Sequence, residues 1–104
     1  DHKKFTISLE EAASMCGLSR FHFSRLFKSF FKTHFKDYLL RRKISAAITL
    51  LSGSELNITE IAYRCEFTDT AYFSQKFKEV LKKTPSEFRK SLLHTEEFNE
   101  ESHG

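Results

Sequence analysis

Two stretches of the sequence place a residue that can read a nucleotide base one helical turn away from an apolar side chain. In CGLSRFHFSRLFK (residues 16–28), Phe21 stands four residues before Arg25, and Arg20 and Lys28 flank the pair. An arginine can donate to a guanine edge, while an apolar group can contact a thymine methyl in the major groove. These residue types at this spacing are therefore suited to contacts with DNA bases.

The stretch CEFTDTAYFSQKFK (residues 65–78) offers a second set of the same kind. Gln75 stands where the first stretch has Arg25, and its side-chain amide can pair with adenine. Ala71 can contact a thymine methyl, and Thr70 can contact a base or a phosphate. We therefore expect two surfaces with related chemistry.

The two stretches belong to a duplicated unit. Residues 8–19 align with residues 57–68 at a shift of 49, and from residue 21 onward the shift becomes 50. The extra residue falls in a turn, and two copies are too few for a solenoid. Identical residues in the two copies include Glu11 and Glu60, Ala13 and Ala62, Cys16 and Cys65, Phe23 and Phe73, Ser24 and Ser74, Phe27 and Phe77, Lys28 and Lys78, and Lys32 and Lys82.

Each copy predicts a helix, a turn and a second helix. Ser8 and Asn57 each stand three residues before a glutamate, which is the pattern of a capping box at a helix start. Thr84-Pro85-Ser86-Glu87 gives the same signal for a last helix near residues 85–92. The first helices are predicted over residues 9–16 and 58–65, and the second helices over residues 20–32 and 69–82.

A long helix is predicted between the copies, because apolar residues recur at helical spacing until Ser52-Gly53. About seventeen helical residues span roughly 26 Å at about 1.5 Å per residue. With its flanking turns, this helix can hold the copies about one DNA turn apart, roughly 34 Å. The sequence thus predicts an all-α fold with two helix-turn-helix subdomains joined by a long linker helix. The expected division is residues 1–34, a linker helix over 35–53, residues 54–92, and a disordered acidic tail over 93–104.

A helical wheel separates two faces on each second helix. Phe27, Leu26 and Phe30 fall within about 60° of Phe23 and predict a buried stripe, while Phe21 lies about 160° away and points toward solvent. In the second copy the predicted stripe consists of Phe73, Phe77 and Val80. The opposite faces are polar or small, and carry Ser24, Arg25, Lys28 and Lys32 in the first copy and Ala71, Ser74, Gln75, Lys78 and Lys82 in the second.

Charge is distributed unevenly between residues 1–91, here called the body, and the end of the chain. Residues 92–104 contain four glutamates and no lysine or arginine, so the net charge of +3 for the whole chain means +7 for residues 1–91. A basic body favours a polyanionic partner. Lysines that only keep the surface soluble would give the same charge.

Other classes of protein are disfavoured by what the sequence lacks. No stretch approaches the roughly 18 apolar residues of a membrane span, and the start at Asp1 predicts no signal peptide. Cys16 and Cys65 have no metal-binding spacing and are predicted to be buried thiols in a reducing cytoplasm. The five histidines show no metal spacing, so we expect no cofactor and no enzyme, although a pairing of His22 with Cys16 remains open. A protein-interaction module that uses exposed aromatics such as Phe21 and Phe31 is the alternative, and its binding would respond little to salt.

The stretch NITEIAYRCEFTDTAYFSQKFKEVLKKTPSEFR (residues 57–89) closely resembles the signature of the AraC/XylS family of bacterial transcription regulators. The first copy and the linker match as well, so that the resemblance covers residues 5–91. The residues that carry it are Ile61-Ala62, Phe67, Tyr72-Phe73-Ser74, Phe77-Lys78 and Thr84-Pro85-Ser86-Glu87-Phe88-Arg89.

The resemblance implies a domain of two homeodomain-like three-helix units that binds promoter DNA and activates transcription with RNA polymerase. The family's base-contacting positions correspond here to Arg20, Phe21, Ser24 and Arg25 in the first copy and to Thr70, Ala71, Ser74 and Gln75 in the second. We expect phosphate contacts from the cationic residues Lys28, Lys32, Arg42, Lys78 and Lys82.

The sequence departs from the family pattern at three turn positions and at its start. Glu66, Lys32 and Lys82 stand where the family commonly has glycine, at positions that often need a positive φ. The family domain usually begins with a further helix, and only Asp1–Lys4 precede FTISLEEAA here. We therefore expect the chain to be a fragment of a larger regulator whose sensor or dimerisation domain lies upstream.

Overall fold

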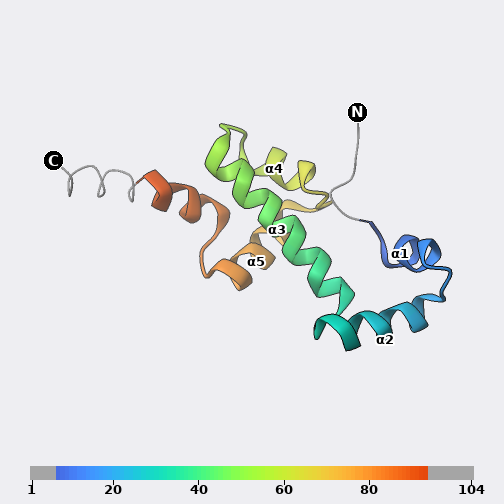
Figure 1. Ribbon diagram of the computed structural model, residues 1–104. Helices are drawn as coiled ribbons and strands as arrows, with labels where there is room; N and C mark the ends of the chain where they lie inside the picture. Colours follow the sequence, from blue (N-terminus) through green and yellow to red (C-terminus); the bar gives the residue numbers. More distant parts are fainter. Residues whose placement is uncertain (1–6, 94–104) are drawn as a thin grey trace. The chain divides into compact units, whose positions relative to one another are not determined.

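The computed structural model describes residues 7–93, and every regular element in this range is a helix (Figure 1). The all-α prediction is confirmed. For the five helices predicted up to residue 82, each predicted first or last residue lies within one residue of the observed one. Residues 85–93 are also helical. The labelled helices are α1 (Leu9–Met15), α2 (Arg20–Phe31), α3 (Phe35–Gly53), α4 (Ile58–Arg64) and α5 (Thr70–Leu81).

The chain divides into two compact units, a first unit (Asp1–Ser45) and a second unit (Ala46–Gly104), and their boundary falls inside α3. The division into residues 1–34, 35–53 and 54–92 stays a prediction. The predicted acidic tail lies outside the described residues, apart from its first residue, Leu93. None of the described helices is both long and apolar enough to cross a membrane.

Side-chain caps fix the ends of the short helices in the first unit. The Ser8 hydroxyl accepts a 3.0 Å hydrogen bond from the Glu11 amide, and the Glu11 carboxylate accepts one of 2.8 Å from the Ser8 amide, so that the predicted capping box is confirmed. After α1 the chain turns at Gly17, whose φ of +68° suits glycine. The Ser19 hydroxyl then accepts a hydrogen bond from the His22 amide and starts α2.

The predicted stripe on α2 is only partly buried. The ring of Phe35 at the start of α3 meets those of Phe23 and Phe27 edge to face, at centroid distances of 5.2 and 5.0 Å. This contact lies on one side of the predicted stripe. Leu26 and Phe30 lie on the other side and are 40% and 78% exposed, so the prediction that they are buried is wrong.

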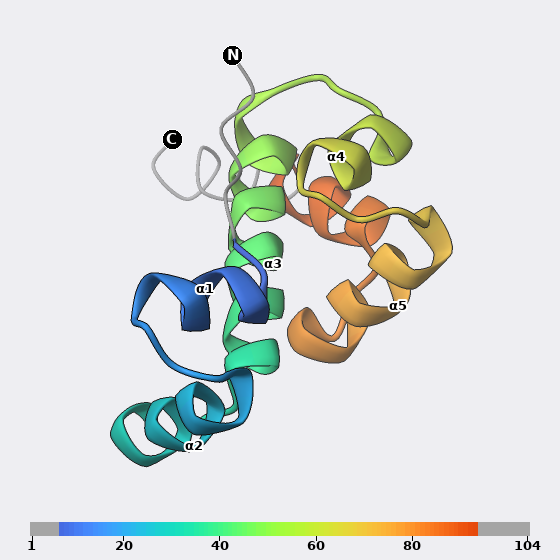
Figure 2. The same ribbon diagram turned by 90° about the vertical axis from the view of Figure 1, so that its right-hand side faces the viewer.

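The second unit buries the corresponding helix more completely. Phe73 and Phe77 of α5 are fully buried, as predicted, and the ring of Phe77 meets that of Phe88 at 5.6 Å. Ala47 and Leu51, from the C-terminal half of α3, are also in the core. Figure 2 shows α4 and the helix over residues 85–93 beside this half of α3.

The two cysteines occupy matching positions but differ in exposure. Cys65 is buried, as predicted, whereas Cys16 is exposed, and the prediction of a second buried thiol is wrong. In the second unit the C-terminal half of α3 precedes α4 and adds apolar residues to the core. The described part of the first unit has no such helix before α1.

Candidate nucleic-acid interface

The outward face of α2 presents the residues that the sequence predicted. Phe21 is 68% exposed, Arg25 is exposed, and Ser24 is half-buried. Phe21 and Arg25 are one helical turn apart and therefore neighbours on the helix surface. A cationic donor and an aromatic ring thus share one open face of this helix.

Arg20, the first residue of α2, is held by contacts on two sides. Its guanidinium lies 3.1 Å from the carboxylate of Glu10 on α1, and its guanidinium carbon lies 5.0 Å from the centroid of the Phe21 ring. The backbone amide of Glu10 and the Arg20 guanidinium hold the pKa of the Glu10 carboxyl below its usual range. Sequence reasoning did not find Glu10, because it is ten residues from Arg20 and carries no motif of its own.

The matching face of α5 carries no charged side chain within the first two turns of the helix. Asp69 caps the helix, and its carboxylate accepts a 2.9 Å hydrogen bond from the Ala71 amide. Ala71 and Gln75 are exposed, while Thr70 and Ser74 are half-buried. The Gln75 amide group lies 3.4 Å from a Glu79 carboxylate oxygen.

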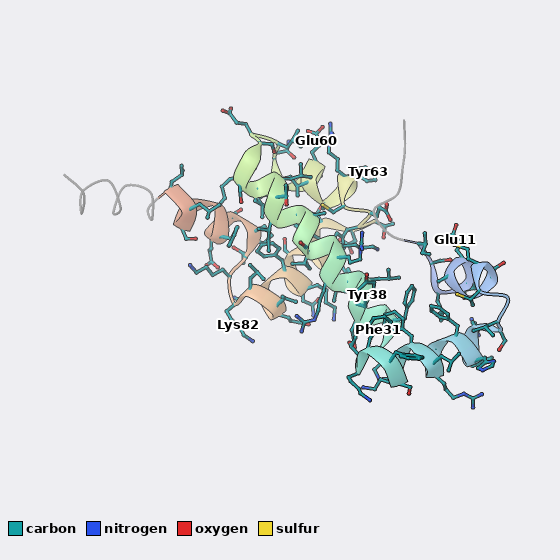
Figure 3. The ribbon with its side chains drawn as sticks, in the orientation of Figure 1. Glu11, Phe31, Tyr38, Glu60, Tyr63 and Lys82 are labelled. Atoms are coloured by element: carbon teal, nitrogen blue, oxygen red, sulfur yellow. The ribbon has the colours of Figure 1, made fainter. Side chains whose placement is uncertain are left out.

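The five cations predicted to contact phosphate are all exposed. Lys28 and Lys82 lie at the ends of α2 and α5, where the Lys28 ammonium is 3.4 Å from the Lys32 carbonyl oxygen and that of Lys82 is 3.3 Å from the Glu79 carbonyl oxygen. The Lys82 side chain extends outward from the helix end (Figure 3). Arg42 donates to the Tyr38 hydroxyl at 3.3 Å.

Three residues that stand in place of glycine adopt the left-handed conformation. Their φ angles are +61° at Lys32, +70° at Glu66 and +67° at Lys82, which confirms that these positions need a positive φ. The turn at Glu66 keeps the hydrogen bonds of the turn at Gly17, since the amides of Glu66 and Phe67 donate to the carbonyls of Tyr63 and Ala62 at 3.0 and 2.9 Å. The second helix-turn-helix thus has the same turn as the first despite the glutamate.

The structure brings the predicted residues together within each unit. Arg20, Phe21, Ser24 and Arg25 lie on the first two turns of α2, and Thr70, Ala71, Ser74 and Gln75 lie on the first two turns of α5. Among residues 7–93, no group of three or more His, Cys, Asp or Glu side chains could hold a metal ion. The local geometry of each unit is that of a helix-turn-helix whose second helix presents a polar face.

Comparison with known proteins gives matches along most of the chain. A family model described as a helix-turn-helix domain matches residues 12–91. The regulatory protein PocR of Salmonella typhimurium is 32% identical over 102 residues, which cover 98% of this chain and 32% of PocR. This chain spans about a third of the length of the curated relatives that it matches.

Solved structures with this fold include a domain of a response regulator and the DNA-binding domain of a transcriptional factor. The C-terminal domain of the two-component response regulator yesN from Fusobacterium nucleatum has a TM-score of 0.77 and 34% identity, and the match covers 86% of each chain. The DNA-binding domain of the global transcriptional factor AdpA, solved with a target DNA, has a TM-score of 0.77 and 26% identity, over 83% of this chain and 78% of that one. The chain therefore belongs to the AraC/XylS family of bacterial transcriptional regulators, and it is an AraC-type helix-turn-helix domain.

Proposed function

We propose that this domain binds promoter DNA in a sequence-specific manner, with α2 and α5 entering successive major grooves. The observation that carries the proposal is the repeated open face on the second helix of each helix-turn-helix. In both copies an exposed side chain able to pair with a purine, Arg25 or Gln75, lies one turn after an exposed apolar residue. The domain of AdpA, which shares this fold, was solved with its target DNA.

The residues divide into two roles. Base recognition is assigned to residues on the first two turns of each second helix, where side chains can reach base edges. Phosphate contacts are assigned to exposed cations, which fix the register and supply salt-dependent affinity. The base-reading set is Arg20, Phe21, Ser24, Arg25, Thr70, Ala71, Ser74 and Gln75, and the phosphate set is Lys28, Lys32, Arg42, Lys78 and Lys82.

The proposal includes a larger regulator that acts in the bacterial cytoplasm. Because the chain spans about a third of its relatives' length, we assign signal sensing or dimerisation to a segment upstream. RNA polymerase is the proposed partner on the promoter. Residues 35–53 serve as the linker between the two reading units. AraC-type domains are not an enzyme class, and we propose no catalytic activity for this one.

The proposal is tested by selecting bound duplexes from a pool of random sequences of about 25 base pairs. The most enriched duplex is then titrated with the protein at two salt concentrations. We expect two conserved blocks about one helical turn apart and a steep loss of affinity with salt. A single short block would mean that only one unit reads bases. A pool without enrichment would contradict the proposed function.

Binding to an apolar protein surface is the second candidate, because Phe30 and Phe31 are 78% and 63% exposed. Salt separates the two candidates. Binding to phosphates releases counterions and weakens steeply as salt rises, whereas an apolar protein contact changes little. A partner protein whose affinity is insensitive to salt, together with no duplex enrichment, would favour this candidate.

A further inference from the structure

An acidic residue of α1 is tied to the start of the proposed recognition helix. The carboxylate of Glu10 lies 3.1 Å from the guanidinium of Arg20, the first residue of α2. The neighbouring Glu11 closes the capping box with Ser8. Glu10 has no part in that box, and its ion pair reaches across the turn to the second helix.

The ion pair is poorly placed to stabilise the fold. The two side chains are 54% and 64% exposed, and ion pairs at such sites contribute little to folding because water and salt screen them. Its main effect is on the conformation of Arg20. An unrestrained arginine samples many rotamers, and ordering it on DNA costs conformational entropy.

Arg20 in turn restrains Phe21. The guanidinium carbon lies 5.0 Å from the Phe21 ring centroid, so the carboxylate, the guanidinium and the ring form one chain of contacts. Phe21 is 68% exposed and belongs to the proposed base-reading set. A substitution at Glu10 therefore alters the conformational freedom of two side chains that are proposed to face the bases.

We propose that Glu10 is a positioning residue for base recognition by the first unit. Its carboxylate holds the Arg20 guanidinium over Phe21 and keeps it from pairing freely with any nearby phosphate. Glu10 thereby lowers affinity for unrelated DNA and sharpens the choice of base. This inference rests on the proposed function, because it requires that α2 reads bases.

The second unit has no ion pair between the residues that correspond to Glu10 and Arg20. Thr59 stands where the first unit has Glu10 in the internal alignment, and Thr70 begins α5 as Arg20 begins α2. Two threonines cannot form an ion pair. The effect of Glu10 should therefore be confined to the half of the site that α2 reads. The duplicated domain thus supplies its own internal comparison.

The test compares Glu10→Ala, Glu10→Gln, Arg20→Ala and the double variant by duplex selection and by titration against matched and mismatched sites. In Glu10→Ala we expect preference at the base pair nearest Arg20 to fall about two- to fivefold, with tighter binding to unrelated DNA. Glu10→Gln keeps a hydrogen-bond acceptor and should retain part of the preference. In the double variant, which also carries Arg20→Ala, the Glu10→Ala change should have no further effect on base preference.

Glu60→Ala is the matched control, because Glu60 is also an exposed acid in the first turn of a helix, paired with Arg64 at 3.5 Å. It should leave base preference in the α2 half-site unchanged. Loss in Arg20→Ala but not in Glu10→Ala would overturn the positioning role while leaving the proposed function intact. Equal loss at all positions would show that Glu10 acts on the fold, and no motif for the unchanged protein would refute the proposed function itself.

Discussion

The guanidinium of Arg89 donates a 2.7 Å hydrogen bond to the carbonyl oxygen of Leu56, in the loop between α3 and α4. The same side chain donates to the carbonyls of Ser54 at 3.1 Å and Leu51 at 3.3 Å. The last carbonyls of a helix and those of the following loop have no partners within the helix. One arginine therefore fixes the end of α3 and the path of the chain into the second helix-turn-helix.

Replacing Arg89 should destabilise the second unit. We expect Arg89→Ala to lower the free energy of unfolding by about 2–4 kcal/mol, because partly buried carbonyls lose charged donors. Urea denaturation monitored by circular dichroism measures the change. Arg89→Lys should recover only a small part of the loss, since an ammonium cannot reach three carbonyls in a planar fork; full recovery would show that charge alone matters.

The left-handed backbone at position 66 should favour glycine over alanine. Glu66 has a φ of +70°, which strains a residue that has a Cβ atom. Both Glu66→Gly and Glu66→Ala remove the side chain and its interactions, so their difference isolates the backbone strain. We expect the free energy of unfolding of the glycine variant to be about 1 kcal/mol higher than that of the alanine variant. Equal stability in urea would contradict this account.

Cys65 should make stability fall in alkaline solution. Burial, with a smaller contribution from the Glu66 carboxylate, raises the pKa of the Cys65 thiol from 9.0 to about 11. Because the folded state holds this proton more tightly, the contribution is complete below pH 9 and is lost as pH rises toward 11. Urea midpoints measured at several pH values should fall across this window.

Cys65→Ala is the control for that window, because it removes the thiol while lysines and tyrosines still titrate. Its stability should fall less steeply with pH than that of the unchanged protein. Parallel curves would show that the buried thiol contributes nothing to the alkaline loss.

Arg25 should affect the choice of base. We expect Arg25→Ala to cost about 1–3 kcal/mol of binding free energy on the selected site and to relax preference at one base pair. The reason is the loss of a donor pair that can match a guanine edge. Titration against single-base variants of the site measures the change, and an equal loss on every sequence would refute the base-reading role.

Lys78 should affect affinity without affecting sequence preference. Lys78→Ala removes an exposed charge near the end of α5, and binding should weaken about equally on all duplexes. The slope of log affinity against log salt should become shallower by about one. Lys90→Ala, an exposed lysine outside the proposed phosphate set, serves as the control. A change limited to one base pair would contradict the phosphate role of Lys78.

The sequence by itself determined the helices and the turns between them. Capping residues such as Ser8 and Asn57, and the periodic apolar residues after them, act over three to four positions and need no tertiary contact. The resemblance to the AraC/XylS family also marked positions 66, 32 and 82 as left-handed, because the family commonly has glycine there. The burial of Phe73 and Phe77 followed from the same short-range periodicity.

Tertiary structure decided which of two equivalent positions is buried and which distant side chains meet. Cys16 and Cys65 share one place in the repeat, yet only Cys65 is buried, because burial depends on the helices that surround each copy. The Glu10–Arg20 ion pair and the Arg89 contact with Leu56 join residues ten and thirty-three positions apart. No local pattern specifies such contacts, since they depend on how folded helices pack.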